Sequence, residues 1–196
     1  HRHIGEPGLG LDEAGGRIVS SVEAFREYQM KEAWTWELQA LTRARFVAGS
    51  ASLAAEFIRI RQDVLCRERD QETLATELLE MRQKMKQQHD SPSSPKHRPG
   101  GLIDIEFIAQ LGVLCSARLY PRVLNVTSTA AQLGELRSIG WLNETQAKAL
   151  DDAMRLLRQQ RMMSTLIRDG EPAEVQTSDT AEIFARKMED SSRTLP

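Results

Sequence analysis

The sequence predicts an all-α protein, a helical bundle preceded by a short Gly-rich segment that forms a loop or a short strand. Three observations support this class. Apolar residues recur at intervals of three and four along most of the chain, strand-like alternation is almost absent, and residues 102–115 are apolar all the way round a helical wheel. With 196 residues, 40% hydrophobic and 28% charged, the chain is long enough to bury a core.

The N-terminal segment is rich in glycine but lacks the preceding strand that a phosphate-binding loop requires. Residues 1–16 are therefore expected to form a loop. Residues 17–19 can form one short strand, and Ser20 or Ser21 can cap the helix that follows.

The first predicted helix, residues 22–48, has charges where an apolar stripe is expected, and Gly49 is expected to end it. Glu37 and Arg45 fall inside an apolar arc of roughly 200° that includes Trp34. Because charges are rarely buried unpaired, two interpretations stay open. One is a structural ion pair, formed between the two residues or with other helices. The other is a helix face that borders a polar site.

Two amphipathic helices are predicted next, the first capped by Ser50 or Ser52. Their apolar stripes consist of Leu53, Phe57, Ile60 and Val64, and of Leu74, Leu78, Met81 and Met85. Arg82, Lys84 and Lys86 lie beside the second stripe, and glutamates share that helix. The favoured interpretation is a solvated face of mixed charge rather than a basic patch.

Prolines, serines and glycines in residues 89–101 cannot continue a helix, so a loop that is partly mobile is predicted. The apolar helix after it belongs in the middle of a bundle. Its only charges, Asp104 and Glu106, lie in the first turn, where the helix dipole favours carboxylates. Alternatively, Lys96 and Arg98 bring cations to the same place, where cations can meet phosphates.

The C-terminal third of the chain contains three further predicted helices. One begins at residue 127 or 128 and ends at residues 139–140. Asn143 and Gln146 fit a capping box for a long helix to about residue 168. A short helix over about residues 180–188 precedes a polar tail.

We therefore divide the chain into three parts. Residues 1–21 would be the remnant of a neighbouring domain, residues 22–170 the helical bundle with its loop, and residues 171–196 a short helix and tail.

Composition excludes several classes of protein. A net charge of −2 argues against a protein that coats nucleic acid. Cys66 and Cys115 form no metal-ligand spacing and are expected to be free thiols. All four histidines lie in the tail or the loop, which disfavours a catalytic triad. No apolar run approaches the ~20 residues that span a bilayer, so no membrane partner and a cytoplasmic location are expected.

Two stretches of the sequence resemble a known family. The first is Glu-Ala-Trp-Thr-Trp-Glu-Leu-Gln-Ala-Leu-Thr-Arg-Ala-Arg at residues 32–45, and the second is Gly-Gly-Leu-Ile-Asp-Ile-Glu-Phe-Ile-Ala-Gln at residues 100–110, preceded by Lys96. Together they resemble the glutamine synthetase adenylyltransferase family, bifunctional enzymes of bacterial nitrogen control. The resemblance covers about residues 16–166, and the first stretch looks like the C-terminal, adenylylating half.

The resemblance implies an enzyme that transfers AMP from ATP to a tyrosine of glutamine synthetase, with Mg²⁺ ions held by carboxylates. This chain would supply the helical domain beside the ATP cleft. The family's metal-binding Asp-x-Asp pair would precede residue 1, so the chain alone is expected to be inactive.

The resemblance also assigns site residues. The candidates for the nucleotide cleft are Lys96, Gly100, Gly101, Asp104 and Glu106. Trp36, Glu37, Arg43 and Arg45 are expected to be structural or to support the cleft, with Glu37 and Arg45 fixing the first helix against residues 100–110. Glu6 is the candidate metal ligand, in the place of a family aspartate.

Two alternatives remain. The chain can be a non-catalytic helical module that binds glutamine synthetase or a nitrogen-signalling regulatory protein. It can also be the helical domain of a related uridylyl-transferring enzyme, which the Trp-Thr-Trp-Glu stretch disfavours.

Overall fold

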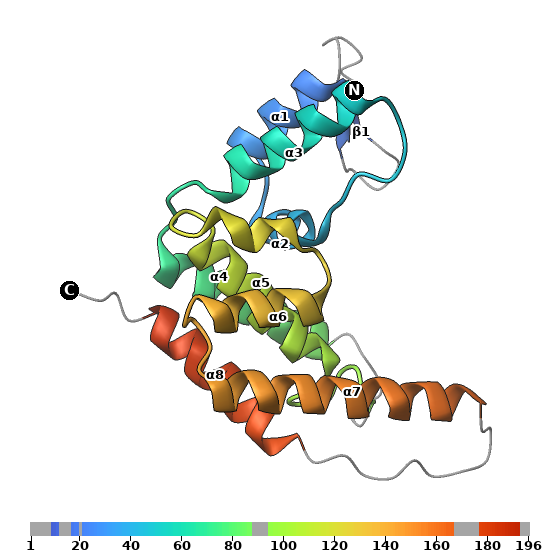
Figure 1. Ribbon diagram of the computed structural model, residues 1–196, viewed down its shortest axis with the longest axis vertical. Helices are drawn as coiled ribbons and strands as arrows, with labels where there is room; N and C mark the ends of the chain where they lie inside the picture. Colours follow the sequence, from blue (N-terminus) through green and yellow to red (C-terminus); the bar gives the residue numbers. More distant parts are fainter. Residues whose placement is uncertain (1–8, 12–16, 20, 88–93, 167–176, 193–196) are drawn as a thin grey trace.

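A computed structural model describes residues 9–11, 17–19, 21–87, 94–166 and 177–192 (Figure 1). The elements in these residues are β1 (Leu9–Leu11), β2 (Arg17–Val19), α1 (Val22–Lys31), α2 (Thr35–Arg43), α3 (Ala51–Leu65), α4 (Gln71–Gln87), α5 (Leu102–Ser116), the 3₁₀ helix η1 (Pro121–Asn125), α6 (Thr129–Ser138), α7 (Glu144–Leu166) and α8 (Ser178–Ser192). The predicted all-α class is confirmed.

Helix α5 is the centre of the bundle. It contacts α2, α4, α6, α7, α8 and η1, and nearly all of its residues are buried, on every side of the helix. A helix that is apolar all round has no face to present to water, so it is stable only when other helices cover it on all sides. The prediction of a central helix after residue 101 is thus confirmed.

Side-chain caps begin most of the other helices, at the places that the sequence indicated. Ser21 and Ser50 accept hydrogen bonds from the backbone N–H groups three residues on, at 3.1 and 3.2 Å. Ser128 does the same for α6 at 3.3 Å. At the start of α7, Asn143 and Gln146 exchange hydrogen bonds of 2.8 and 3.2 Å, which is the reciprocal capping box that the sequence predicted.

The prediction of a single helix over residues 22–48 is wrong, because the chain forms two shorter helices there, α1 and α2. The chain turns extended at Trp34, and the Glu37 carboxylate accepts a hydrogen bond of 2.9 Å from the Trp34 N–H, so a new helix starts there. Ala44 is extended as well, so α2 ends at Arg43 and not at Gly49. The prediction that Trp34 belongs to a broad apolar arc of one helix is also wrong, since the Trp34 side chain is 70% exposed.

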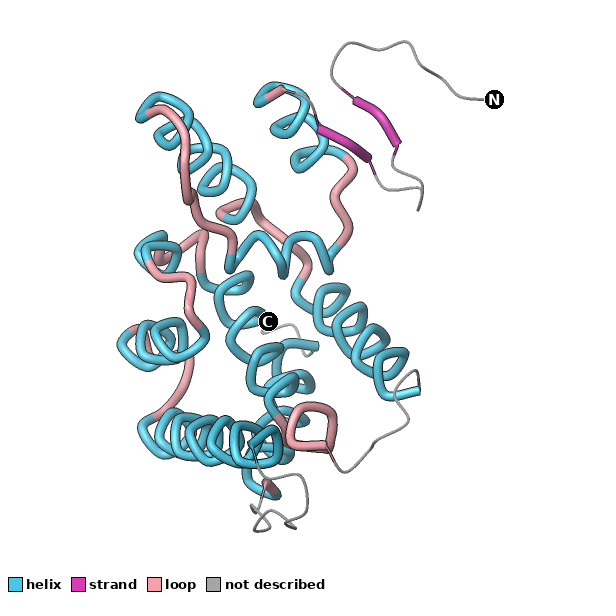
Figure 2. Tube along the Cα trace, turned by 90° about the vertical axis from the view of Figure 1, so that its right-hand side faces the viewer, coloured by secondary structure: helices cyan, strands magenta, loops and turns pink. Residues whose placement is uncertain are grey.

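Helices α1 and α3 lie side by side at one end of the molecule (Figure 1). Phe25 and Phe57 stack between them, with ring centroids 6.1 Å apart. Beside α1, β1 and β2 form an antiparallel pair in which Leu9 lies opposite Val19 (Figure 2). The assignment of this segment to a neighbouring domain stays a prediction.

Helix α8 returns to the bundle and packs on α4, α5 and α7. It is longer than the predicted helix of residues 180–188 and buries Phe184 and Met188 in the same core as α5. The predicted division of the chain at residue 171 stays a prediction. Within the described residues, no helix combines the length and the apolar character needed to cross a membrane.

Candidate functional site

The turn that leads into α5, residues 94–101, carries the candidate lysine. Its carbonyl groups accept hydrogen bonds from the first amides of the helix: Leu102 N–H donates to Pro95 O at 3.1 Å and Ile103 N–H to Lys96 O at 3.2 Å. The turn therefore closes the N-terminus of α5 with its own backbone. The Lys96 side chain is exposed.

The two candidate glycines occur where a side chain does not fit. Gly100 has φ +70°, and a Cβ on it would lie 2.2 Å from the Thr177 carbonyl oxygen at the start of α8. A Cβ on Gly101 would lie 2.8 Å from the Arg98 carbonyl oxygen. The Thr177 hydroxyl also donates to Pro99 O at 2.9 Å. The glycine pair thus allows the C-terminal helix to lie directly on the turn.

Asp104 is buried and is held on two sides. One carboxylate oxygen accepts a hydrogen bond from the Gly100 N–H at 2.6 Å, and the other pairs with the Arg82 guanidinium. Arg82 also donates to His97 O at 2.8 Å. Asp104 therefore caps the turn and joins α4 to α5.

The prediction that Arg82 belongs to a solvated face is wrong, because this residue is 1% exposed. The sequence does carry a signal for the burial of Arg82, in its spacing from the apolar residues of α4. Leu74, Leu78 and Arg82 follow one another at intervals of four, so Arg82 occupies the apolar stripe of α4. A guanidinium there needs a carboxylate on a facing helix, and Asp104 provides it.

Two polar contacts join α2 to α5. Arg43 and Glu106 form an ion pair of 3.3 Å at the surface. Deeper in, the Gln39 side-chain amide donates to the Gln110 side-chain oxygen at 2.8 Å, and both residues are buried. These two contacts fix α2 against α5. The sequence predicted that Glu37 and Arg45 would make this connection.

Glu37 has other partners. Besides capping α2, its carboxylate accepts a hydrogen bond of 2.6 Å from the Tyr28 hydroxyl on α1. The predicted ion pair with Arg45 or another helix is not among these contacts: Glu37 acts as a helix cap and a partner of Tyr28, and not as an anchor against residues 100–110. Arg45 is exposed beyond the end of α2, at the rim of a groove between α1 and α3.

Arg61 is a buried cation that the sequence analysis missed. Its guanidinium donates to the carbonyl oxygens of Leu41, Thr42 and Leu124, at 2.9, 2.6 and 2.7 Å. Burial lowers the pKa of this guanidinium from its usual value. By closing the C-terminus of α2 onto α3 and η1, it holds the helix from which Arg43 projects.

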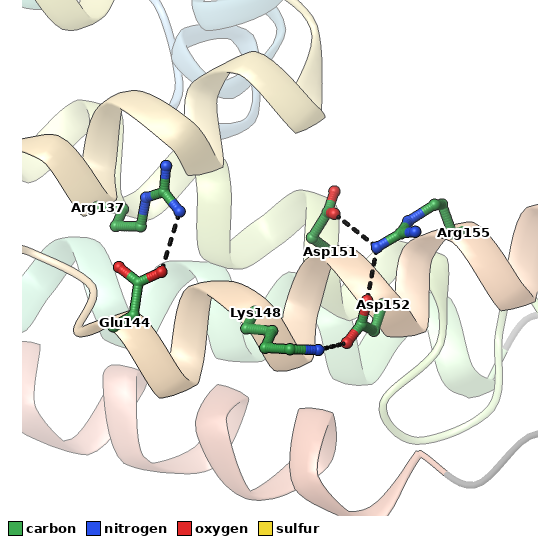
Figure 3. Close-up of polar contacts among 6 residues, drawn as sticks. All are labelled: Arg137, Glu144, Lys148, Asp151, Asp152 and Arg155. Carbon is green, nitrogen blue, oxygen red and sulfur yellow. Dashed lines mark hydrogen bonds and ion pairs between the residues drawn. The ribbon is translucent and has the colours of Figure 1, made fainter.

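Several charged side chains on the exposed face of α7 are paired (Figure 3). Arg155 pairs with Asp151 and Asp152, and Lys148 pairs with Asp152, all within four residues on one helix. Arg137 on α6 reaches Glu144 at 3.1 Å. Mixed charge of this kind is typical of a solvated helix face.

A cavity of about 470 Å³ lies between the start of α2 and α4. Its lining consists of Ala33, Trp34, Thr35, Trp36, Glu77, Glu80, Met81 and Lys84. Trp36 is half exposed here. Of the assigned residues that the structure describes, only Trp36 lines this cavity.

Carboxylates are not gathered for a metal ion in the part of the chain that the structure describes. It holds no group of three or more His, Cys, Asp or Glu side chains placed for a metal. Asp104 already serves Arg82 and Gly100, and Glu106 serves Arg43. Glu6 lies outside the described residues. The donor set therefore does not fit Mg²⁺ at these positions.

The two cysteines are free thiols, as predicted. Burial raises the pKa of the Cys115 thiol from 9.0 to about 11, and burial also raises the pKa of Cys66. Both thiols are thus poor nucleophiles at neutral pH.

Comparison with known proteins gives two family matches and many relatives. Residues 12–60 match the sequence model of the glutamate-ammonia ligase adenylyltransferases, and residues 72–194 match that of the GlnD PII-uridylyltransferases. A protein of Neisseria meningitidis serogroup B is 40% identical over 171 residues, covering 87% of this chain and 18% of the relative. One of Methylococcus capsulatus is 44% identical over 142 residues, covering 70% and 15%.

Both relatives carry the name bifunctional glutamine synthetase adenylyltransferase/adenylyl-removing enzyme. A protein of Hahella chejuensis with the same name is 40% identical over 176 residues, covering 85% of this chain and 18% of the relative. The chain thus spans less than a fifth of the length of these relatives.

Proposed function

Because the chain belongs to the glutamine synthetase adenylyltransferase family, we propose that it is the helical domain of an enzyme that transfers AMP from ATP to a tyrosine of glutamine synthetase. In this role it forms one wall of the ATP cleft. The transfer itself requires Mg²⁺ to withdraw charge from the phosphate. We place those ions outside the described residues, since no carboxylate cluster here fits them.

The observation that supports this role is the rigid turn before α5. It is fixed from below by Asp104, through the Gly100 N–H, and from the side by Thr177. It presents Lys96 to the solvent, with Arg98 half-buried beside it. Because the backbone of the turn is already fixed, only the lysine side chain has to be ordered on meeting a phosphate, which is a useful property in a cleft wall.

In this proposal one candidate residue contacts the nucleotide, and the others hold the wall of the cleft in shape. Lys96 meets the triphosphate. Gly100, Gly101 and Asp104 shape the turn that carries it, and Glu106 fixes α2 through Arg43. Arg43 supports the wall rather than the nucleotide.

Calorimetric titration with ATP tests the role of Lys96. Lys96→Ala is expected to weaken ATP binding about tenfold or more, the effect of losing a charged contact to phosphate. Lys148→Ala is the matched control, since Lys148 is exposed and pairs with Asp152 on a distant face. Equal affinity of Lys96→Ala and the unchanged chain would remove Lys96 from the cleft.

Incubation of the chain with ATP, Mg²⁺ and glutamine synthetase tests whether these residues alone can transfer AMP. The chain alone is expected to leave glutamine synthetase unmodified. Stoichiometric attachment of AMP, measured by mass spectrometry, would show instead that the transfer chemistry resides in these residues.

A second function, a non-catalytic module that binds glutamine synthetase or a nitrogen-signalling regulatory protein, is favoured by one observation. The exposed indoles of Trp34 and Trp36 are the kind of side chain that protein interfaces bury. Binding of either protein by a chain that does not bind ATP would favour this second function.

A further inference from the structure

Two tryptophan side chains at the start of α2 are exposed to solvent. Trp34 is 70% exposed and Trp36 48% exposed, whereas Trp141, the third tryptophan, packs against the core. Tryptophan buries more apolar area than other side chains, so leaving two of them in water costs stability with no gain to the fold. Exposed tryptophans in a shared pocket are typical of residues that a partner covers.

The pocket that these two tryptophans help to line is already formed. The Thr35 hydroxyl donates to Glu77 on α4, and Glu37 caps the Trp34 N–H at 2.9 Å. The start of α2 is therefore tied to α4 and to its own first turn. A preformed pocket spares a partner the cost of ordering it.

The rim of the pocket is acidic. Glu77 and Glu80 lie on the side formed by α4, and among the described lining residues Lys84 alone carries a positive charge. Negative charge around aromatic rings disfavours phosphates and carboxylates. It favours a guanidinium or an ammonium group, which the indole faces also attract. Met81 also lines the pocket and offers an adaptable apolar contact for the residue beside that cation.

We propose that this pocket, which we call the tryptophan pocket, binds an arginine or lysine side chain on an exposed segment of glutamine synthetase. The identity of the partner rests on the proposed function, whereas the chemistry of the pocket does not. The pocket would hold the substrate protein while another part of the enzyme modifies it, so it contributes to affinity and not to the transfer step.

The chemistry of the pocket is tested first with an acetylated tetra-arginine amide and the whole chain. Binding is followed by tryptophan fluorescence and confirmed by calorimetry. The unchanged chain is expected to bind the peptide, with affinity that falls as salt rises. Trp34→Ala/Trp36→Ala is expected to abolish the calorimetric signal. No binding by the unchanged chain, or equal binding by the double variant, would overturn the proposal.

Opposite charge changes on α4 then test the sign of the ligand. Glu80→Lys is expected to weaken peptide binding about tenfold, and Lys84→Glu to strengthen it. Glu72→Lys is the matched control, because Glu72 lies on the same helix and outside the lining. Weaker binding by Lys84→Glu, or fluorescence quenching by ATP that depends on Lys84, would show an anion site and overturn the proposal.

The partner is tested with immobilised glutamine synthetase. The unchanged chain is expected to bind, and Trp34→Ala/Trp36→Ala to lose about 30-fold in affinity, as interface tryptophans typically do. Leu156→Ala, which removes a half-exposed apolar side chain of α7, is the control. Peptide binding without binding of glutamine synthetase would reject the proposed partner, and equal binding by the double variant would reject the pocket as its docking site.

Discussion

Arg82 and Asp104 form a buried ion pair across α4 and α5, and each side chain is only 2% exposed. The pair is positioned directly under the turn that carries Lys96, because Asp104 also accepts the Gly100 N–H at 2.6 Å. A buried ion pair contributes little net stability, but breaking it leaves one charge unpaired. This pair therefore governs whether the turn keeps its shape.

Replacement of Asp104 by asparagine is predicted to lower the free energy of unfolding by about 3–5 kcal/mol, since the Arg82 charge stays buried without a counter-charge. Urea denaturation measures the change. Arg82→Met in the same chain is expected to restore part of the loss. The control, Asp152→Asn, breaks only exposed pairs on α7 and is expected to have a far smaller effect. Similar losses in both aspartate variants would show that burial of the pair is unimportant.

The amide contact between Gln39 and Gln110 is predicted to behave as a coupled pair. Gln39→Leu or Gln110→Leu alone leaves a buried polar group without its partner, at a cost of about 1–3 kcal/mol. The double variant is expected to be more stable than the sum of the single losses indicates. A double-mutant cycle by chemical denaturation gives the coupling energy. Additive effects would mean that water replaces the lost partner.

Gly100→Ala is predicted to loosen α8 rather than to unfold the bundle. The new Cβ would meet the Thr177 carbonyl oxygen at 2.2 Å, and φ +70° is strained for alanine. Hydrogen exchange is expected to quicken in residues 178–192 with little change in the middle of α5. Gly134→Ala is the control, because a Cβ there meets no atom within 4 Å apart from its chain neighbours and the adjacent backbone of its own helix. Unchanged exchange in α8 would place the constraint elsewhere.

Stability is predicted to fall at alkaline pH through Cys115. Because burial raises its folded-state pKa to about 11, the folded protein holds the thiol proton more tightly than the unfolded chain. This contribution is complete below the unfolded-state pKa and is lost as pH rises through the folded-state value. The slope is at most about 1.4 kcal/mol per pH unit. Denaturation of the unchanged chain and of Cys115→Ala between pH 8 and 11 measures it, and parallel curves would contradict it.

Local signals allowed much of the fold to be predicted. The caps at Ser21, Ser50 and Ser128 act on backbone groups within three residues, so the sequence alone identifies them. The break between α1 and α2 was missed because no proline or glycine marks it. A local signal is present in Glu37, three residues after Trp34, whose carboxylate caps the new helix, but on a single long helix this residue is only a misplaced charge.

The position of the turn before α5 was predictable from the sequence, but its contacts were not. The turn at Lys96 and the carboxylate at Asp104 follow from composition near Gly100 and Gly101. Arg82, the partner of Asp104, is 22 residues away along the chain. The contact of Thr177 with Pro99 spans 78 residues. Contacts of this separation depend on how helices pack, which no local pattern encodes.

The contact of α8 with the turn also has a consequence for synthesis. A ribosome delivers Pro99 and Gly100 well before Thr177. Until Thr177 and α8 are synthesised, the turn before α5 is uncovered on the side that α8 later occupies. The apolar surface of α4 and α5 that α8 covers is exposed during the same time. The nascent chain therefore passes through an interval in which a chaperone can engage this surface, and that interval closes when α8 docks.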